Sequence, residues 1–200
     1  VFNFANKKFG KYPYSEYSFI QGGDGGMEYP MATLITGERT FVSLVGVAVH
    51  ELMHSWYQMV LGSNEALYHW MDEGFTTYAE DRVQAFLDGN KGFAYDGTYR
   101  GYVGLAKSGK EEPLTIHADH FNLNSAYGAA VYSKGGVFME QLGYIVGAPV
   151  RDKILLEYYK QWRFKHPNAN DFMRVAEKVS NMKLDWYKEY WINSTRTIDY

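Results

Sequence analysis

The feature that most constrains this chain is the run His50-Glu51-Leu52-Met53-His54, an H-E-x-x-H sequence inside an apolar segment. On a helix, residues four apart lie on the same face, so His50 and His54 can direct ring nitrogens at one metal ion. Glu51 lies about 100° further round the helix, beside that ion rather than on it. The run therefore predicts a helix that carries two metal ligands and a neighbouring carboxylate.

A third ligand is predicted in the sequence W-M-D-E-G of residues 70–74, where Glu73 follows His54 by nineteen residues. Two imidazoles, one carboxylate and an open position are the ligand set of a catalytic zinc site. Zinc lowers the pKa of a bound water to about 7, and Glu51 is placed to accept the proton. These residues predict one zinc ion and metal-assisted hydrolysis.

The flanks of the H-E-x-x-H run argue against the alternative, a surface helix with two incidental histidines. Apolar residues occupy nearly every face of the segment from Phe41 to Leu61. This pattern predicts a buried helix that ends near Gly62. Three ionisable groups inside such a helix are costly without partners, and a metal is one way to satisfy them.

Composition narrows the class of protein. The chain has 200 residues, of which 46% are hydrophobic and 22% charged, as expected for one globular domain or a two-lobed one. A net charge of −3 gives no indication of a nucleic acid or an anionic membrane as partner. The absence of cysteine excludes disulfides and thiolate ligands but leaves the compartment unassigned. No apolar stretch is long enough to span a bilayer, and the start at Val1 suggests an excised piece of a longer protein.

Along the chain, the pattern predicts a small sheet lobe followed by a helical lobe, an α+β arrangement. Strands are expected at 17–21 and 32–36, on either side of a glycine-dense turn at 22–30. The stretch from Ser108 to Ala126 reads as a long loop with a functional role. Helices are predicted at about 42–61, 71–88, 94–106, 134–146, 149–163, 169–180 and 184–193.

Four motifs in order resemble the gluzincin aminopeptidases, of the aminopeptidase N and leukotriene hydrolase type. They are Gly25-Gly26-Met27-Glu28, the H-E-x-x-H run, the glutamate in residues 70–75, and Tyr132-Ser133-Lys134-Gly135. The resemblance covers about residues 15–195 and implies a thermolysin-like metallopeptidase catalytic domain over residues 1–200. Residues 1–40 would be the end of its sheet lobe and 41–200 its helical lobe. The flanking domains of full-length relatives, an N-terminal β domain and a C-terminal helical domain, do not appear in this sequence.

The resemblance also implies a reaction, namely zinc-dependent removal of the N-terminal residue from peptides that have a free N-terminus. In that family the glutamate that matches Glu28 binds the α-amine of the substrate. The backbone of the preceding residues contacts the peptide, which assigns substrate binding to Gly25, Gly26 and Met27. An ordinary glycine turn with an exposed glutamate is the alternative interpretation. The family usually has Asn where this chain has Tyr29, which weakens the detail of the amine site.

Two tyrosines match residues of the family near the reacting carbonyl. Tyr132 matches the tyrosine whose hydroxyl stabilises the oxyanion, and Tyr127 matches a second tyrosine of the same pocket. For any one of the eighteen tyrosines, core packing is the alternative.

Carboxylates that orient the histidine ligands are expected close by, because metal-bound histidines pass their other N–H to an acceptor. Glu80, two turns along the helix from Glu73, is the preferred candidate, with Asp72 as another. Asp72 also departs from the family, which often has Asn there. The remaining histidines lack ligand spacing and are interpreted as loop or core residues, although His120 has a place in the long loop where it could line the cleft. They are His69, His117, His120 and His166.

Three alternatives to an aminopeptidase stay open from the sequence. An endopeptidase with the same zinc chemistry would cleave N-blocked peptides. An epoxide hydrolase activity occurs in some relatives with the Gly-Gly-Met-Glu motif, and nothing in this chain supports it. A scaffold that has lost its activity is disfavoured because all three ligands and the candidate base are present.

Overall fold

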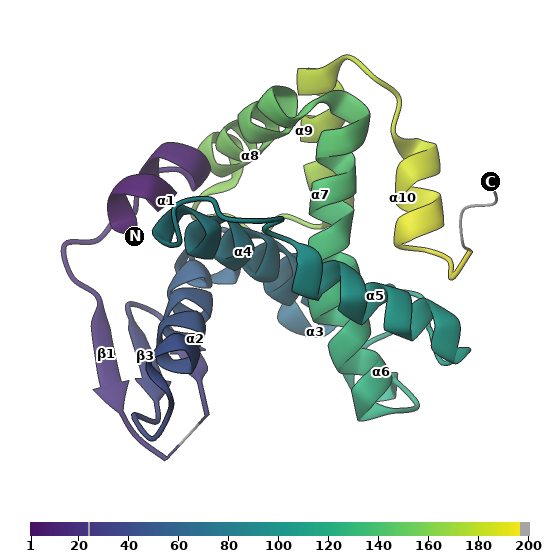
Figure 1. The fold of residues 1–200 in the computed structure, drawn as a ribbon. Coiled ribbons are helices and arrows are strands. Elements are labelled where there is room, and N and C mark those ends of the chain that lie inside the picture. The colour runs from purple at the N-terminus through teal and green to yellow at the C-terminus, as the bar shows by residue number, and fades with distance from the viewer. Residues whose placement is uncertain (24, 197–200) are drawn as a thin grey trace.

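A computed structural model describes residues 1–23 and 25–196, and these form a small sheet at one end of a helical body (Figure 1). The α+β class predicted from the sequence is therefore confirmed. The sheet contains β1 (Ser18–Gln21), β2 (Met27–Tyr29) and β3 (Ala32–Ile35) in the order β1-β3-β2. β1 runs parallel to β3, and β2 runs antiparallel to it.

β2 lies inside the stretch that the sequence predicted to be a turn, which also includes Asp24, outside the described residues. A three-residue strand is too short to show a reliable alternation in sequence. In the structure its pattern is clear, because Met27 and Tyr29 are exposed and Glu28 between them is buried. Glu28 pairs in register with the buried Thr33 of β3, so both side chains face the helical body.

The helical body combines ten α-helices with three π-helical segments and one 3₁₀ turn in the described residues. The α-helices are α1 (Phe2–Phe9), α2 (Phe41–Met53), α3 (Glu65–His69), α4 (Phe75–Leu87), α5 (Asp96–Ser108), α6 (Asn124–Gly128), α7 (Gly135–Val146), α8 (Ala148–Trp162), α9 (Ala169–Ser180) and α10 (Asp185–Trp191). The other segments are the π-helices η1 (Ser55–Val60), η2 (Trp70–Gly74) and η4 (Ala129–Lys134) and the 3₁₀ turn η3 (Ala118–His120).

Several predicted boundaries were wrong. The sequence did not predict α1, which buries Ala5 and Phe9 and lies beside α8 (Figure 1). The single helix predicted at 42–61 breaks at Tyr57, whose φ of −105° and ψ of 94° are not helical. Two helices start earlier than predicted, because α3 and η2 precede α4, and α6 and η4 precede α7. The predicted loop therefore ends at Leu123 and contains η3.

Aromatic side chains from distant segments form the centre of the core. Trp70 of η2 packs edge-on against Phe75 and Phe138, with ring centroids 5.6 and 5.1 Å apart. Phe172 of α9 contacts the same two phenylalanines. The core therefore fixes η2 and α4 against α7 and α9, and with them the side chains that η2 presents.

Two glycines let η2 and α7 touch through their backbones. A Cβ at Gly74 would lie 2.6 Å from the Cα of Gly135, and a Cβ at Gly135 would lie 2.8 Å from the Cα of Gly74. Any larger residue would push the two segments apart. This crossing sets Glu73, one residue before Gly74, close to Tyr132, three residues before Gly135. Within the part of the chain that the structure describes, no helix is long and apolar enough to cross a membrane.

Candidate active site

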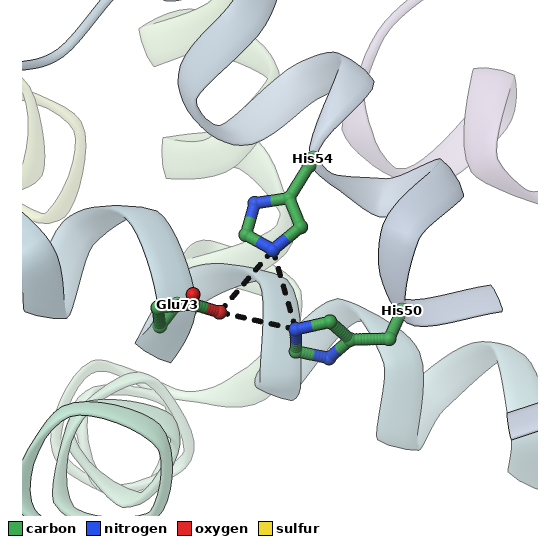
Figure 2. A group of neighbouring side chains, drawn as sticks. All are labelled: His50, His54 and Glu73. Atoms are coloured by element: carbon green, nitrogen blue, oxygen red, sulfur yellow. Dashed lines mark hydrogen bonds and ion pairs between the residues drawn. The ribbon is translucent and has the colours of Figure 1, made fainter. Parts of the chain in front are cut away.

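His50, His54 and Glu73 bring three donor atoms together, as the sequence predicted. Figure 2 shows both rings and the carboxylate directed toward one point between α2 and η2. The Nε2 atoms of His50 and His54 lie 3.2 Å apart, and they lie 3.1 and 3.2 Å from Oε2 of Glu73. The three donors form a nearly equilateral triangle.

That triangle fits a tetrahedral zinc ion. Ligands at 2.0–2.2 Å from zinc, separated by tetrahedral angles, lie about 3.3 Å from one another. The observed separations of 3.1 to 3.2 Å agree with this value. Two imidazole nitrogens and one carboxylate oxygen are also donors that zinc accepts, and they leave a fourth position open.

The outer nitrogens of both histidines meet acceptors. Nδ1 of His50 lies 2.8 Å from Oε2 of Glu80, and Nδ1 of His54 lies 2.7 Å from Oδ1 of Asp72. Each carboxylate suggested by the sequence therefore contacts a different histidine. Acceptors on Nδ1 favour the tautomer that leaves the Nε2 lone pair free for a metal.

The break at Tyr57 gives His54 a further acceptor. Because the backbone leaves the helical conformation there, the carbonyl oxygen of Tyr57 turns back to lie 3.1 Å from Nδ1 of His54. The hydroxyl of Thr76 donates to the same carbonyl oxygen at 3.2 Å. A π-helical segment next to a site of this kind is a common arrangement.

Electrostatics around the triangle favour positive charge. Burial alone would lower the pKa of His50, but hydrogen bonds to Glu73 and Glu80 outweigh it and raise the pKa to about 9. Burial acts in the same way on His54, and Asp72 and Glu73 together hold its pKa well above the ordinary value. For Glu73, burial would raise the pKa, yet its bonds to the two imidazoles hold it well below its usual range. Carboxylates that attract protons to two buried imidazoles attract a metal cation for the same reason.

Glu51 lies beside the triangle with a free oxygen. The residue is 7% exposed, and within the described structure its Oε2 has no hydrogen-bond partner. Burial raises the pKa of its carboxyl above the ordinary value. A Cβ at Gly26 would lie 2.5 Å from Oε1 of Glu51 and 2.6 Å from Cγ2 of Val47. Glu51 can occupy this position only because residue 26 is a glycine, since a side chain there would displace its carboxylate.

Glu28 reaches the same site from β2. It is 8% exposed, and one of its carboxylate oxygens lies within 4.8 Å of donor atoms of Glu51 and His54. Gly26 and Met27 line the adjoining cavity. Gly25 has a different environment, since its carbonyl oxygen accepts a hydrogen bond from Nη2 of Arg39.

Tyr132, which belongs to η4, also lines the site. Its hydroxyl donates to Oε1 of Glu73 at 2.8 Å, and its ring stacks on His50 with centroids 5.6 Å apart. Burial and the neighbouring Glu73 carboxylate hold the pKa of Tyr132 far above its usual value, so the hydroxyl stays a donor. Tyr127 lies one turn earlier and also lines the cavity.

These groups surround a cavity of about 410 Å³. Five of its residues were not among the sequence-predicted site residues, namely Glu65, Ala66, His69, Ala118 and Asp119. His69 was expected in a loop or the core; it is buried, yet it also lines this cavity. The spacing of Glu65 and His69, four apart on one helix, is the signal in sequence that links them. The full lining is Gly26, Met27, Glu28, His50, Glu51, His54, Glu65, Ala66, His69, Asp72, Glu73, Ala118, Asp119, Tyr127 and Tyr132.

The other histidines lie elsewhere. His120 is exposed at the end of η3 and is not one of the residues around the cavity, and His117 begins the same turn. His166 is a loop residue, and its Nδ1 lies 2.9 Å from the carbonyl oxygen of Gly62.

Comparison with known families places the chain in one of them. The model of the peptidase family M1 domain matches residues 1–191. The chain belongs to this family. The resemblance to the gluzincin aminopeptidases seen in the sequence is therefore confirmed, and the H-E-x-x-H run and Glu73 of the M1 domain lie inside the matched region.

Curated relatives of the M1 domain are longer proteins. Aminopeptidase B from Rattus norvegicus is 30% identical over 205 residues, which cover 94% of this chain and 29% of that protein. Leucine aminopeptidase 2 from Chaetomium globosum is 29% identical over 187 residues, which cover 81% of this chain and 30% of that protein. The chain thus spans about three-tenths of the length of these relatives. The flanking domains and the division of the M1 domain at residue 40 stay predictions.

Solved structures share the fold. The M1 zinc metallopeptidase from Deinococcus radiodurans superposes with a TM-score of 0.79 at 20% identity, over 97% of this chain and 42% of that one. Leukotriene A4 hydrolase from Saccharomyces cerevisiae gives a TM-score of 0.77 at 21% identity, over 96% of this chain and 33% of that one. Because the sequence identities are only 20 and 21%, these superpositions show that the fold of the M1 domain is shared and nothing further.

Proposed function

We propose that this M1 domain is the catalytic part of a zinc aminopeptidase, which removes the N-terminal residue of peptides with a free α-amine. The observation that carries the proposal is the triangle of His50, His54 and Glu73, with separations of 3.1 to 3.2 Å. Beside it lies Oε2 of Glu51, which has no hydrogen-bond partner among the described residues. Membership of the peptidase family supports the reaction class.

The zinc ion would be held by His50, His54 and Glu73. When bound, it supplies Lewis-acid polarisation of the scissile carbonyl and an acidified water. Glu51 accepts the proton of the attacking water on Oε2, which has no other partner in the described structure. The same carboxyl then donates that proton to the leaving amine, so it acts as base and acid in turn.

Tyr132 stabilises the charge that develops on the carbonyl oxygen. Its hydroxyl already lies at the metal ligands, 2.8 Å from Oε1 of Glu73, and its raised pKa keeps the proton on oxygen. Rotation from Glu73 toward the substrate would direct the same donor at the oxyanion. One such donor is typically worth about 10²–10³ in rate.

Glu28 recognises the free N-terminus. An ammonium group that enters the cavity meets this buried carboxylate and forms a charge-assisted hydrogen bond. An internal or acylated residue leaves the carboxylate buried and unpaired, which disfavours such substrates. Tyr29, which replaces the usual Asn of the family, is exposed on the other face of β2. Its side chain therefore adds nothing to amine recognition.

The test uses the full-length, zinc-loaded protein on a panel of aminoacyl reporter substrates. We expect Glu51→Gln to lower kcat by about 10²–10⁴, the usual contribution of a general base, while zinc content is unchanged. Glu38→Gln, the same change on an exposed loop, serves as control. Equal activity of Glu51→Gln and the parent protein would contradict the mechanism.

The same assay separates the alternatives. Cleavage of N-acetylated peptides as fast as of free ones would indicate an endopeptidase and would contradict the role of Glu28. Absence of zinc from the correctly folded protein would indicate a non-catalytic scaffold. No observation on the described residues favours an epoxide hydrolase.

A further inference from the structure

The motif Tyr132-Ser133-Lys134-Gly135 contains a buried cation that has no part in the chemistry proposed above. Lys134 is 1% exposed, and lysine is almost never fully buried unless it is paired. It is the last residue of η4, the segment that carries Tyr132. Residues two apart on a helix project to nearly opposite sides. In agreement with this, Tyr132 lines the cavity and Lys134 is not among the lining residues.

Two partners hold the ammonium group of Lys134. Its Nζ lies 2.6 Å from Oε1 of Glu111, and it donates a hydrogen bond to the carbonyl oxygen of Ser194 at 3.0 Å. The side chain of Glu111 is itself only 7% exposed, so the ion pair is withdrawn from solvent. Neither partner lines the cavity. The lysine therefore ties η4 to one segment that precedes it and to another that follows α10.

The residues on either side of this lysine are held just as closely. A Cβ at Gly101 of α5 would overlap Oγ of Ser133 and lie 3.0 Å from its Cβ, so α5 approaches η4 through a glycine. Gly135 in turn touches the backbone of Gly74. Each of the three residues that follow Tyr132 is thus fixed by a different segment of the molecule.

Tyr132 itself is held mainly through its hydroxyl and the face of its ring. The hydroxyl donates to Oε1 of Glu73 at 2.8 Å, the ring stacks on His50, and the residue is 37% exposed. The role in oxyanion stabilisation requires the hydroxyl to leave Glu73 for the substrate. A tyrosine has only two side-chain torsions, so the place that its hydroxyl then reaches depends on the backbone of η4.

We propose that Lys134 and Glu111 are positioning residues, whose buried ion pair holds the backbone of η4 where the hydroxyl of Tyr132 can reach the oxyanion. The proposal rests on the function proposed above and adds two residues that do not touch the substrate. A buried ion pair is often no more stabilising than apolar side chains of the same volume, so stability alone is a weak reason for this one. Misplacement of a catalytic group by about 1 Å, in contrast, can cost about 10² in rate.

Replacement of both charges together separates positioning from stability. The change is Lys134→Met with Glu111→Met in the zinc-loaded, full-length protein, and we expect it to fold with unchanged zinc content. On aminoacyl reporter substrates, kcat should fall by about tenfold and KM should change less than about twofold, because the oxyanion donor acts in the transition state. Lys160→Met with Glu157→Met is the matched control and leaves kcat unchanged. It removes a more exposed ion pair of α8, a helix that contributes no residue to the cavity.

A Tyr132→Phe background shows whether the pair acts through the tyrosine. Without the hydroxyl there is no donor to position, so the paired substitution should lower kcat by less than about twofold further. Glu111→Gln is a milder variant that keeps the shape and one acceptor oxygen for Lys134. We expect it to lower kcat by about threefold in the parent protein and to have no effect in the Tyr132→Phe protein. It decides the same question if the paired variant does not fold.

The outcomes separate this proposal from the function on which it rests. An equal fractional loss of kcat in both backgrounds, or a loss that follows a loss of zinc, would overturn the positioning role and leave the role of Tyr132 standing. Unchanged kcat in both the paired variant and Glu111→Gln would overturn it as well. A Tyr132→Phe protein as active as the parent, or a parent that turns over none of the substrates, would contradict the proposed function itself, and the positioning role would fall with it.

Discussion

At the scale of single residues, the site depends on where side chains are missing as much as on where they are present. Glu51 keeps its position because Gly26 has no Cβ to occupy the space beside its Oε1. Glu73 lies close to Tyr132 because Gly74 and Gly135 let two helical segments touch. The glycines therefore set distances between the side chains of the candidate site.

Substitution of Gly26 by alanine tests this directly. The added methyl would lie 2.5 Å from Oε1 of Glu51, so the carboxylate must move. We expect kcat of the full-length protein to fall by at least tenfold, because small misplacements of a catalytic group are costly. The midpoint of thermal unfolding should shift little, since the end of a side chain can yield. Gly23→Ala is the control, because its Cβ meets nothing within 4 Å. Unchanged kcat in Gly26→Ala would show that the clash is relieved elsewhere.

At the scale of elements, the three π-helical segments found in the described residues all serve the site. η1 turns the Tyr57 carbonyl toward His54, η2 carries Asp72 and Glu73, and η4 carries Tyr132. The segments η2 and η4 each insert a residue into a run of helix and change the direction of the side chains that follow, whereas η1 contains the break at Tyr57. A regular helix through the same residues would point these side chains elsewhere.

The segment η4 is anchored by Lys134, which is 1% exposed. Its ammonium lies 2.6 Å from Oε1 of Glu111 and donates to the carbonyl oxygen of Ser194 at 3.0 Å. Lys134→Met leaves Glu111 buried without its partner, so we expect a loss of about 3 kcal/mol in the free energy of unfolding. The double change Lys134→Met with Glu111→Met removes both charges and should recover most of that loss. Thermal and urea unfolding would measure both, and a double variant no more stable than the single one would contradict the argument.

At the scale of the whole molecule, Asp152 of α8 joins segments that lie far apart in the sequence. Its carboxylate lies 3.0 Å from Nζ of Lys8 in α1 and 2.7 Å from Nη1 of Arg82 in α4. Burial would raise the pKa of Asp152, but bonds from Arg82 and Lys8 outweigh it and lower the pKa to about 2. This ion cluster therefore links the N-terminal helix to the helix that carries Glu80.

The sign of the pH dependence follows from that shift. The folded pKa of about 2 lies below the unfolded value of about 3.9, so the stabilisation is complete above pH 4 and is lost between pH 4 and pH 2. We expect Asp152→Asn to cost about 1 kcal/mol more at pH 6 than at pH 3. Unfolding midpoints of the parent and the variant, compared at pH 6 and pH 3, should therefore approach each other as the pH falls. A constant difference would show that the charge of Asp152 contributes nothing.

How much was predictable differs from one part of the site to another. The approach of His50 and His54 followed from helical spacing, because one turn of helix fixes which residues share a face. Their orienting carboxylates were also placed correctly, since Glu80 lies on the helix that starts just after Glu73. Boundaries at the breaks and π segments were wrong, because those depend on tertiary contacts that override local preference. α1 was missed for the same reason, since its stability comes from packing on α8.

The sequence by itself therefore determined the α+β class, the resemblance to a peptidase family, and the placing of His50, Glu51 and His54 together on one helical run. All of these depend on residue type and short-range spacing. Only the tertiary structure decided that Tyr57 turns its carbonyl toward His54 and that Gly26 makes room for Glu51. It alone also joined His69 to Asp119, fifty residues away, on one wall of the cavity. The physical reason is that such contacts arise where segments distant in sequence pack together, and no periodicity within one segment records them.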